Sequence, residues 1–279
     1  MHPRPRLALF ALAALAVAVV LGRSGTPGGV DPAAAPAAAI ATQPVPLFAD
    51  AQVGTGDGGS SGGVEVAPSG PDELPGPGAW VGTATSNRVR IWSRPGAGGS
   101  VRETIDASNP WDQQLAFPVV RAQLEANGTA WYRIMLGVEP NGSTGWIRAS
   151  EVTLERSTDR VVVDLSAHTL QHRRGGEVIH RFRVGIGAGN TPTTPGRFFV
   201  WASLLPADPN GPYGSYLLGL SGFSDVLQSW PGGGRLAIHG TDDPTDRGAD
   251  VSHGCVRVFN PQMDRLRDVP MGTVVVIRR

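Results

Sequence analysis

Lysine is absent from this 279-residue sequence, and all 24 of its basic residues are arginines. The absence excludes a Schiff-base lysine and a serine–lysine nucleophile pair, because both chemistries require a lysine amine. The arginines balance the acidic residues to a formal net charge of zero, and no long basic run occurs. Proteins that bind nucleic acids usually carry a basic patch or stripe. We therefore expect no nucleic-acid partner.

Cysteine occurs only once, at Cys255. A disulfide within the chain is therefore excluded, although an exported chain would normally oxidise paired cysteines. Three interpretations of a lone cysteine remain: an inert buried thiol, a link to another molecule, or a catalytic nucleophile. The residues around Cys255 have to decide among them.

The first 22 residues are predicted to be a signal peptide or an N-terminal membrane anchor. A basic start with His2, Arg4 and Arg6 precedes an unbroken apolar run from Leu7 to Leu21. As a helix this run is about 22 Å long, short of the roughly 30 Å hydrocarbon core, which favours a signal peptide. No small-x-small cleavage site directly follows the run, so an uncleaved anchor remains the alternative. Either way we expect an extracytoplasmic protein, in the cell wall or periplasm, that meets the membrane only through this segment.

Residues 23–78 are dominated by Gly, Ala, Pro, Ser and Asp. Such a composition cannot bury enough apolar surface to offset the entropy of ordering, so it predicts a disordered linker.

Residues 79–156 contain short β-rich segments separated by turn signals such as Asn141-Gly142. About four or five strands in such a length predict a small barrel. The segments Val89-Arg90-Ile91-Trp92 and Gly145-Trp146-Ile147 resemble those of a bacterial SH3-like module. Its tryptophans line a peptide groove in one interpretation and pack the core and rim of the barrel in the other: Trp80, Trp92, Trp131 and Trp146.

Residues 160–279 continue the β pattern. A Gly175-Gly176 pair between two β-rich segments predicts a hairpin turn. One short helix is predicted, with Asn260 as its N-cap, Pro261 in its first turn, and apolar residues at helical spacing. The expected fold class is mainly β, with no alternation of strands and helices that would favour a parallel α/β sheet.

The chemically richest segment of the chain lies between His239 and Arg257. His239-Gly240-Thr241 ends a strand-like run, and Ser252-His253-Gly254-Cys255-Val256-Arg257 follows after a polar loop. A thiol needs a base or cation beside it to react near neutral pH, since its usual pKa is about 8.5. A glycine before the nucleophile lets backbone amides approach a developing oxyanion. These residues together predict covalent acyl transfer. A zinc site would have only three candidate ligands at irregular spacing, His239, His253 and Cys255, which argues against it. We expect no metal and no cofactor.

These two motifs resemble the signature of L,D-transpeptidase (YkuD-like) catalytic domains. Three further segments of residues 160–279 also resemble elements of that family: Thr194-Pro195-Gly196, Tyr213-Gly214 and the terminal segment Gly272 to Ile277. The resemblance implies a β-sandwich catalytic domain and an enzyme that cross-links peptidoglycan stem peptides between their third residues. Donor and acceptor would both be tetrapeptide stems, and β-lactams of the carbapenem type would be inhibitors.

The resemblance also implies roles for individual residues. Cys255 would attack the donor carbonyl and form a thioester, and His239 would be the base that takes the thiol proton. The carbonyl of Gly240 would orient His239, the Gly254 amide would contribute to the oxyanion hole, and His253 would support the pocket. The implied substrate-binding residues are Arg257, Ser252, Tyr213 and Thr241.

Alternatives to transpeptidation remain open at this point. L,D-carboxypeptidase action on the same stems needs only water in place of the acceptor amine. A protein that binds peptidoglycan without turnover would be expected if Cys255 or His239 were missing, and both are present. On reference values, protonation of His239 would slow acylation in the region of about pH 6 to 7. A resting thiolate–imidazolium pair would move this limb to lower pH.

Overall fold

The computed structural model describes residues 65–66, 79–227 and 233–279. The predicted export segment 1–22 lies outside these ranges. Within the predicted linker 23–78 the structure describes only Glu65–Val66, which form the short strand β1. No helix in the described part of the chain has the length and apolar character that a membrane crossing requires.

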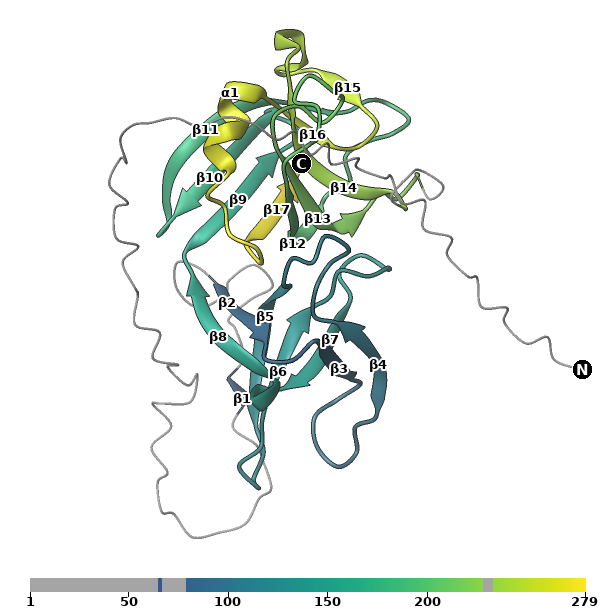
Figure 1. Cartoon of the computed structure of the whole chain (residues 1–279), viewed down its shortest axis with the longest axis vertical. Coiled ribbons are helices and arrows are strands. Elements are labelled where there is room, and N and C mark those ends of the chain that lie inside the picture. Colours follow the sequence, from purple (N-terminus) through teal and green to yellow (C-terminus); the bar gives the residue numbers. More distant parts are fainter. Residues whose placement is uncertain (1–64, 67–78, 228–232) are drawn as a thin grey trace, which may run out of the picture. The chain divides into compact units, whose positions relative to one another are not determined.

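The first sheet is formed by strands β1 to β8 (Figure 1). Its strands pair in the order β4-β3-β7-β6-β5-β2-β8, and β1 pairs with β5. Side chains alternate between the two faces of each strand, and the apolar ones face inward. In β3, for example, Val89 and Ile91 are fully buried, and Arg88 and Arg90 are exposed. After β1, the bounds are β2 (Ala79–Ala84), β3 (Arg88–Trp92), β4 (Val101–Asp106), β5 (Ala116–Leu124), β6 (Ala130–Met135), β7 (Thr144–Arg148), η1 (Ala149–Glu151) and β8 (Val152–Ser157).

The tryptophans of this sheet pack into it. Trp131 and Trp146 are buried, and Trp92 meets the Trp131 ring edge to face with centroids 5.4 Å apart. Arg148 lies over both Trp92 and Trp131. The packing interpretation therefore holds for these three rings. The sheet is barrel-like, and its SH3-like character stays a prediction.

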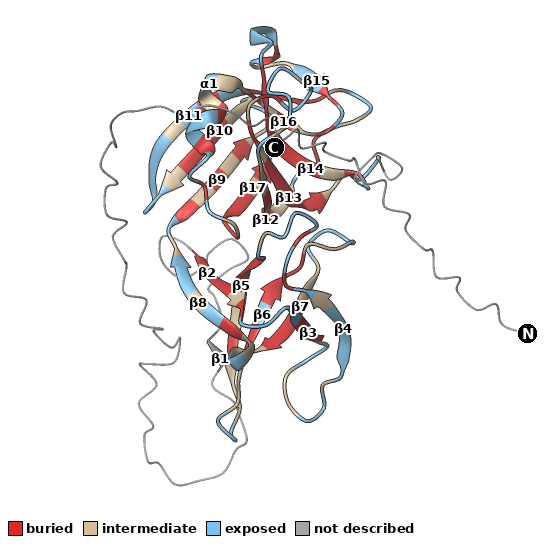
Figure 2. Ribbon diagram, in the orientation of Figure 1, coloured by how far each residue is buried: buried red, intermediate tan, exposed pale blue. Residues whose placement is uncertain are grey.

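The second sheet contains nine strands in the order β10-β9-β17-β12-β13-β14-β16-β11-β15. Because β10 pairs with both β9 and β11, the sheet closes around one buried core, which Figure 2 shows in red. The predicted mainly β class with one short helix is confirmed. The bounds are β9 (Asp159–Asp164), β10 (Thr169–Arg174), β11 (Glu177–Gly187), β12 (Gly196–Leu204), β13 (Leu217–Phe223), β14 (Arg235–Thr241), η2 (Pro244–Asp246), β15 (Asp250–Ser252), β16 (Val256–Phe259), α1 (Asn260–Met263), η3 (Asp264–Leu266) and β17 (Val274–Arg278).

The predicted hairpin at Gly175-Gly176 is confirmed. It joins β10 to β11, and both glycines have positive φ, at 61° and 94°. Two adjacent residues with positive φ form the tight hairpin turn whose twist matches that of the flanking strands, which explains the Gly-Gly pair.

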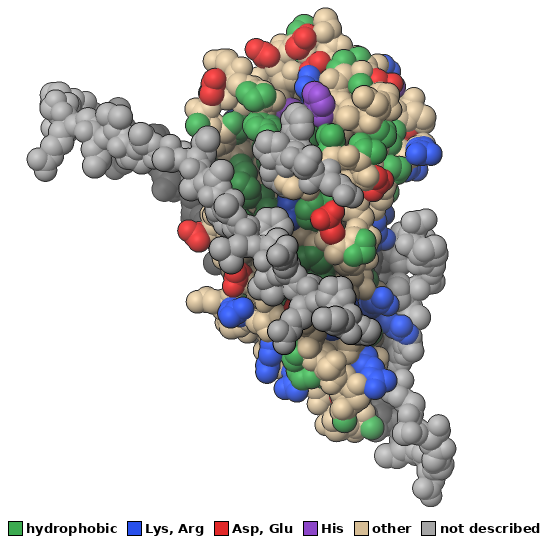
Figure 3. Space-filling model, turned by 90° about the vertical axis from the view of Figure 1, so that its right-hand side faces the viewer, with side chains coloured by type: hydrophobic (Ala, Val, Ile, Leu, Met, Phe, Trp, Pro, Cys, Tyr) green, Lys and Arg blue, Asp and Glu red, His purple; other side chains and the backbone are tan. Residues whose placement is uncertain are grey.

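On the face of the molecule in Figure 3, arginine and acidic side chains both occur among apolar and uncharged ones.

The predicted helix cap is wrong by one residue. Phe259 is the N-cap, and Asn260 is already the first helical residue. The Asn260 side chain instead accepts a hydrogen bond from the Ser215 amide at 2.9 Å, so a tertiary contact replaces the local cap. The helix lasts one turn and continues as the 3-10 turn η3. Val269 follows the helical residues, which end at Leu266. The three residues of the predicted apolar face are nevertheless buried: Met263, Leu266 and Val269.

Candidate active site

The two motifs meet because β14 and β16 are parallel neighbours. Ile238 pairs with Val256, and His239 pairs with Arg257. Ile238 and Val256 point into the core, so by the two-residue period of a strand His239 and Arg257 point to the opposite face. Cys255 directly precedes β16. The register thus brings the segments that carry the predicted base and the predicted nucleophile side by side.

His239 is buried, and its Nδ1 lies 2.9 Å from the carbonyl oxygen of Gly240. A carbonyl can only accept, so Nδ1 carries the proton and the lone pair of the neutral ring is on Nε2. Burial lowers the pKa of His239 to about 4, and the nearby positive charge of Arg257 also lowers it. The ring is therefore neutral at any pH near 7.

The Cys255 side chain is held beside β14. The backbone amide of Ala237, two residues before His239, donates a hydrogen bond toward the sulfur. Burial nevertheless raises the pKa of the Cys255 thiol above its usual range. A raised thiol pKa and a lowered imidazole pKa together mean that the resting pair is a neutral thiol and a neutral ring. The arrangement fits a base that removes the thiol proton during attack.

The turn before Cys255 is held by Ser252. The Ser252 hydroxyl donates to the Cys255 carbonyl at 2.6 Å and accepts from the Gly254 amide at 3.1 Å. Gly254 has a φ of 116°, a conformation that disfavours any side chain. An oxyanion at this turn would share the Gly254 amide with Ser252 or take it from Ser252.

Tyr213 covers the buried ring. Its side chain is 44% exposed and meets His239 edge to face, with ring centroids 5.4 Å apart. The Gly240 amide donates to the Tyr213 carbonyl at 3.0 Å, which ties this loop to β14. A Cβ on Gly240 would come within 2.8 Å of the Ser215 amide nitrogen, so only glycine allows this approach. Tyr213 is thus both a packed residue and a partial lid.

Arg257 and Thr241 meet at an acidic residue that the sequence did not single out. Oδ2 of buried Asp246 accepts from Thr241 Oγ1 at 2.7 Å and from Arg257 Nη1 at 3.3 Å. Several acidic residues share the 242–250 loop, and local sequence does not distinguish a buried one from exposed ones. The Thr241 hydroxyl is used inside this loop, so its contact with substrate stays a prediction.

Residues 158–277 match the family model of the YkuD L,D-transpeptidase catalytic domain. These residues belong to the YkuD family. Over 120 residues the chain is 32% identical to the YkuD protein of Bacillus subtilis (strain 168), covering 43% of this chain and 65% of the relative. Over 119 residues it is 32% identical to the YkuD protein of Bacillus licheniformis, covering 42% and 64%. The chain therefore spans less than two thirds of these relatives.

Solved structures of L,D-transpeptidases are also similar to the YkuD domain. A mutant from Enterococcus faecium is 25% identical with a TM-score of 0.35, covering 43% of this chain and 49% of that one. An enzyme from Mycobacterium smegmatis is 17% identical with a TM-score of 0.35, covering 54% and 91%. The E. faecium catalytic domain acylated by ertapenem is 25% identical with a TM-score of 0.34, covering 43% and 96%. Because these TM-scores are below 0.5, the assignment rests on the sequence matches.

The remaining predicted residue of the YkuD site is His253. It is exposed, beside the buried Ser252 and Gly254. Its proposed support of the pocket stays a prediction. Among the residues that the structure describes, no three His, Cys, Asp or Glu side chains are arranged to hold a metal ion.

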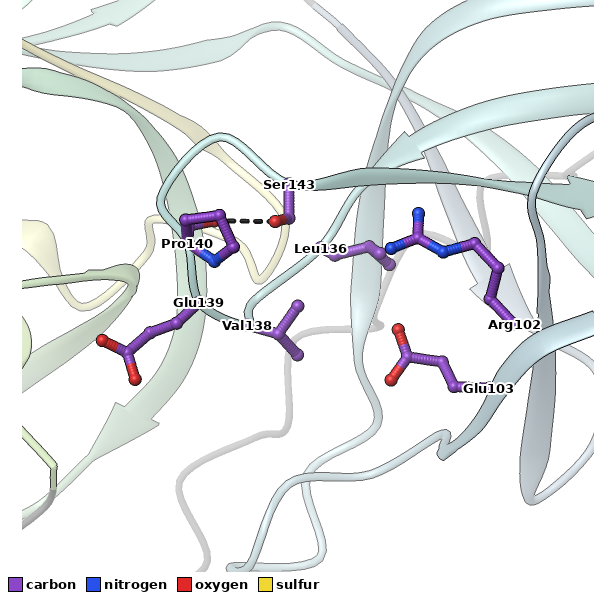
Figure 4. A pocket seen from close by; sticks show the side chains of 7 residues that line it. All are labelled: Arg102, Glu103, Leu136, Val138, Glu139, Pro140 and Ser143. Carbon is purple, nitrogen blue, oxygen red and sulfur yellow. Dashed lines mark hydrogen bonds between the residues drawn. The ribbon is translucent and has the colours of Figure 1, made fainter. Parts of the chain in front are cut away.

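A cavity of about 320 Å³ lies outside the YkuD domain, on the first sheet (Figure 4). Arg102 and Glu103 come from strand β4, and the other lining residues come from the loop that joins β6 to β7. This cavity contains none of the predicted site residues. Its lining residues are Arg102, Glu103, Leu136, Val138, Glu139, Pro140 and Ser143.

Proposed function

We propose that this protein is an L,D-transpeptidase that cross-links peptidoglycan stem peptides through a thioester on Cys255. One observation carries the proposal. The parallel pairing of β14 and β16 sets the strand that carries His239 beside the strand that Cys255 precedes, and His239 Nδ1 donates to the Gly240 carbonyl. A nucleophile, an oriented base and backbone amides next to the nucleophile are the parts that acyl transfer requires.

The first step forms the thioester. His239 Nε2 takes the thiol proton while the sulfur of Cys255 bonds to the carbonyl carbon of the third stem residue. Negative charge develops on the carbonyl oxygen, near the amides of Gly254 and Cys255. When the carbonyl re-forms, the bond to the terminal D-Ala breaks, and its nitrogen receives the proton from His239. D-Ala leaves with a free amine.

The second step uses the amine of another stem. That amine attacks the thioester, passes a proton to His239 and displaces the Cys255 sulfur, which regains the proton. The product is an amide between third residues of two stems. Arg257 is the proposed contact for a substrate carboxylate, because a guanidinium binds carboxylates through paired donors.

We place the reaction outside the cytoplasmic membrane, in the cell wall or periplasm. The basic and apolar start of the chain supports export, and the polymer on which the enzyme would act lies there. The direct test is to delete the first 22 residues and measure the protein in the extracytoplasmic fraction. We expect the shortened protein to be lost from that fraction.

Carbapenem acylation tests the nucleophile. We expect the full chain to gain the mass of one carbapenem, as the acylation of the E. faecium domain by ertapenem suggests. The variant Cys255→Ala removes the only thiol in the chain and should show no adduct. A folded wild-type protein that gains no mass would contradict the proposal.

Defined tetrapeptide stems test the reaction itself. Transpeptidation predicts cross-linked dimers between third residues in muropeptides separated by mass, and these should vanish in Cys255→Ala. Release of tripeptide without dimers would indicate L,D-carboxypeptidase activity instead. If the protein binds peptidoglycan but forms neither dimers nor tripeptide, it is a binding protein without turnover.

A further inference from the structure

Asp246 occupies an unusual position for an acidic side chain in a polar loop. It is 4% exposed, at the end of the 3-10 turn η2, although Asp242 and Asp243 on the same loop are exposed. Burying a carboxylate is costly unless it is paired and hydrogen-bonded. Asp246 meets this requirement through Thr241 and Arg257, so the loop folds around this one carboxylate.

The pairing with Asp246 leaves Nε of Arg257 without a hydrogen-bond partner among the described residues. Asp246 contacts Nη1 only, and Nε is buried. Nε and Nη2 form the side edge of a guanidinium, where two parallel N–H groups fit a carboxylate. A buried donor without a partner is unfavourable, which suggests that a ligand supplies the partner.

We propose that Asp246 is a positioning residue that holds Arg257 by Nη1 and thereby aims the rest of the guanidinium at a carboxylate of the substrate. The inference rests on the proposed function, because the carboxylate is that of a stem peptide or of a carbapenem. Thr241 has a structural part in this arrangement, since its hydroxyl fixes the carboxylate that holds Arg257.

The same pair adjusts the charge around His239. The side chains that act on this ring are Tyr213 by contact and Arg257 and Asp246 by charge. In the proposed mechanism Cys255 also faces the ring as its proton donor. The charge of Arg257 lowers the pKa of His239, and that of Asp246 raises it. Removing the Asp246 charge leaves Arg257 unbalanced, so the pKa of His239 should fall further.

The test measures carbapenem acylation of the full chain as a function of carbapenem concentration. Asp246→Asn removes the charge and keeps the shape, and Asp242→Asn makes the same charge change at an exposed site of the same loop. We expect Asp246→Asn to raise the half-saturating concentration about tenfold, with the maximal rate within threefold of wild type. Asp242→Asn should match wild type.

Two further probes separate positioning from general loop damage. A carbapenem with its carboxylate methylated should bind wild type and Asp246→Asn equally well. Iodoacetamide, which is neutral, should alkylate Cys255 in both proteins at rates within about twofold at pH 7.5. The acid limb of that alkylation should lie at lower pH in Asp246→Asn.

The outcomes are distinct. Equal half-saturation for Asp246→Asn and Asp242→Asn, or the same loss with the methylated compound, would overturn the inference. A severe loss of iodoacetamide reactivity would assign Asp246 to folding of the loop and also overturn it. If wild type reacts with iodoacetamide but with no carbapenem, the proposed function itself fails.

Discussion

Nδ1 of His239 donates to the carbonyl oxygen of its own chain neighbour, Gly240, at 2.9 Å. In many catalytic sites a carboxylate occupies this place and stabilises the charged ring. A neutral carbonyl orients the ring without adding a negative charge. Burial lowers the pKa of the ring, and the hydrogen bond to the Gly240 carbonyl offsets this effect only in part, so the ring resists protonation.

Acylation of Cys255 should stay nearly constant from about pH 5 to pH 8. His239 must be neutral to accept a proton, and its pKa of about 4 means that it loses this capacity only in more acidic solution. The acid limb should therefore lie near pH 4, below the region of about pH 6 to 7 expected from reference values. The measurement is the rate of carbapenem acylation, followed by the mass shift of the protein, as a function of pH. A midpoint above pH 6 would contradict the neutral buried ring.

Tyr213→Ala should move that acid limb upward. The substitution opens His239 to water, which reduces the burial that lowers its pKa, so the midpoint should shift toward the ordinary value of about 6.5. Tyr213→Phe keeps the ring and should leave the midpoint unchanged. The same pH series on both variants checks this, and a shift in the phenylalanine variant would assign the effect to the hydroxyl.

Gly254→Ala should destabilise the protein by about 1–2 kcal/mol. The cause is the φ of 116°, because the nearest atom to an added Cβ is 3.6 Å away and leaves enough space. Gly189→Ala is the control, since a Cβ there meets no atom within 4 Å and its φ is not in the strained range. Urea midpoints of the two variants give the comparison. Equal midpoints would mean that the turn before Cys255 relaxes without cost.

Arg235→Ala should destabilise the protein by about 2–4 kcal/mol, because it removes charged hydrogen bonds and cation–π packing. Arg235 lies over the rings of Trp201 and Phe223, with centroid distances of 3.9 and 4.3 Å. It also donates to the carbonyls of Leu220 and Gly137, both at 3.1 Å.

Arg156→Ala provides the control for Arg235→Ala, because Arg156 is exposed on β8. Its effect on urea unfolding should stay within about 0.5 kcal/mol, as is usual for exposed surface substitutions. If Arg235→Ala lowers the free energy of unfolding by no more than this, the half-buried guanidinium contributes little net stability.

The sequence by itself determined the parts of the protein that depend on local pattern. Alternating apolar residues specify strands, Gly175-Gly176 specifies a hairpin, and Met263 and Leu266 define the buried side of the last helical segment. The motifs around His239 and Cys255 also indicated the chemistry, because few residue types can act as nucleophile and base. These inferences need only spacing and residue type.

The tertiary structure decided whatever depends on partners far apart in the chain. Asn260 is drawn from its expected cap by the Ser215 amide, and Asp246 is selected from several similar acids by its contacts with Thr241 and Arg257. The low pKa of His239 likewise comes from burial under Tyr213 and within the sheet. Burial and long-range contacts arise only when strands pair, so residue type and spacing alone do not reveal them.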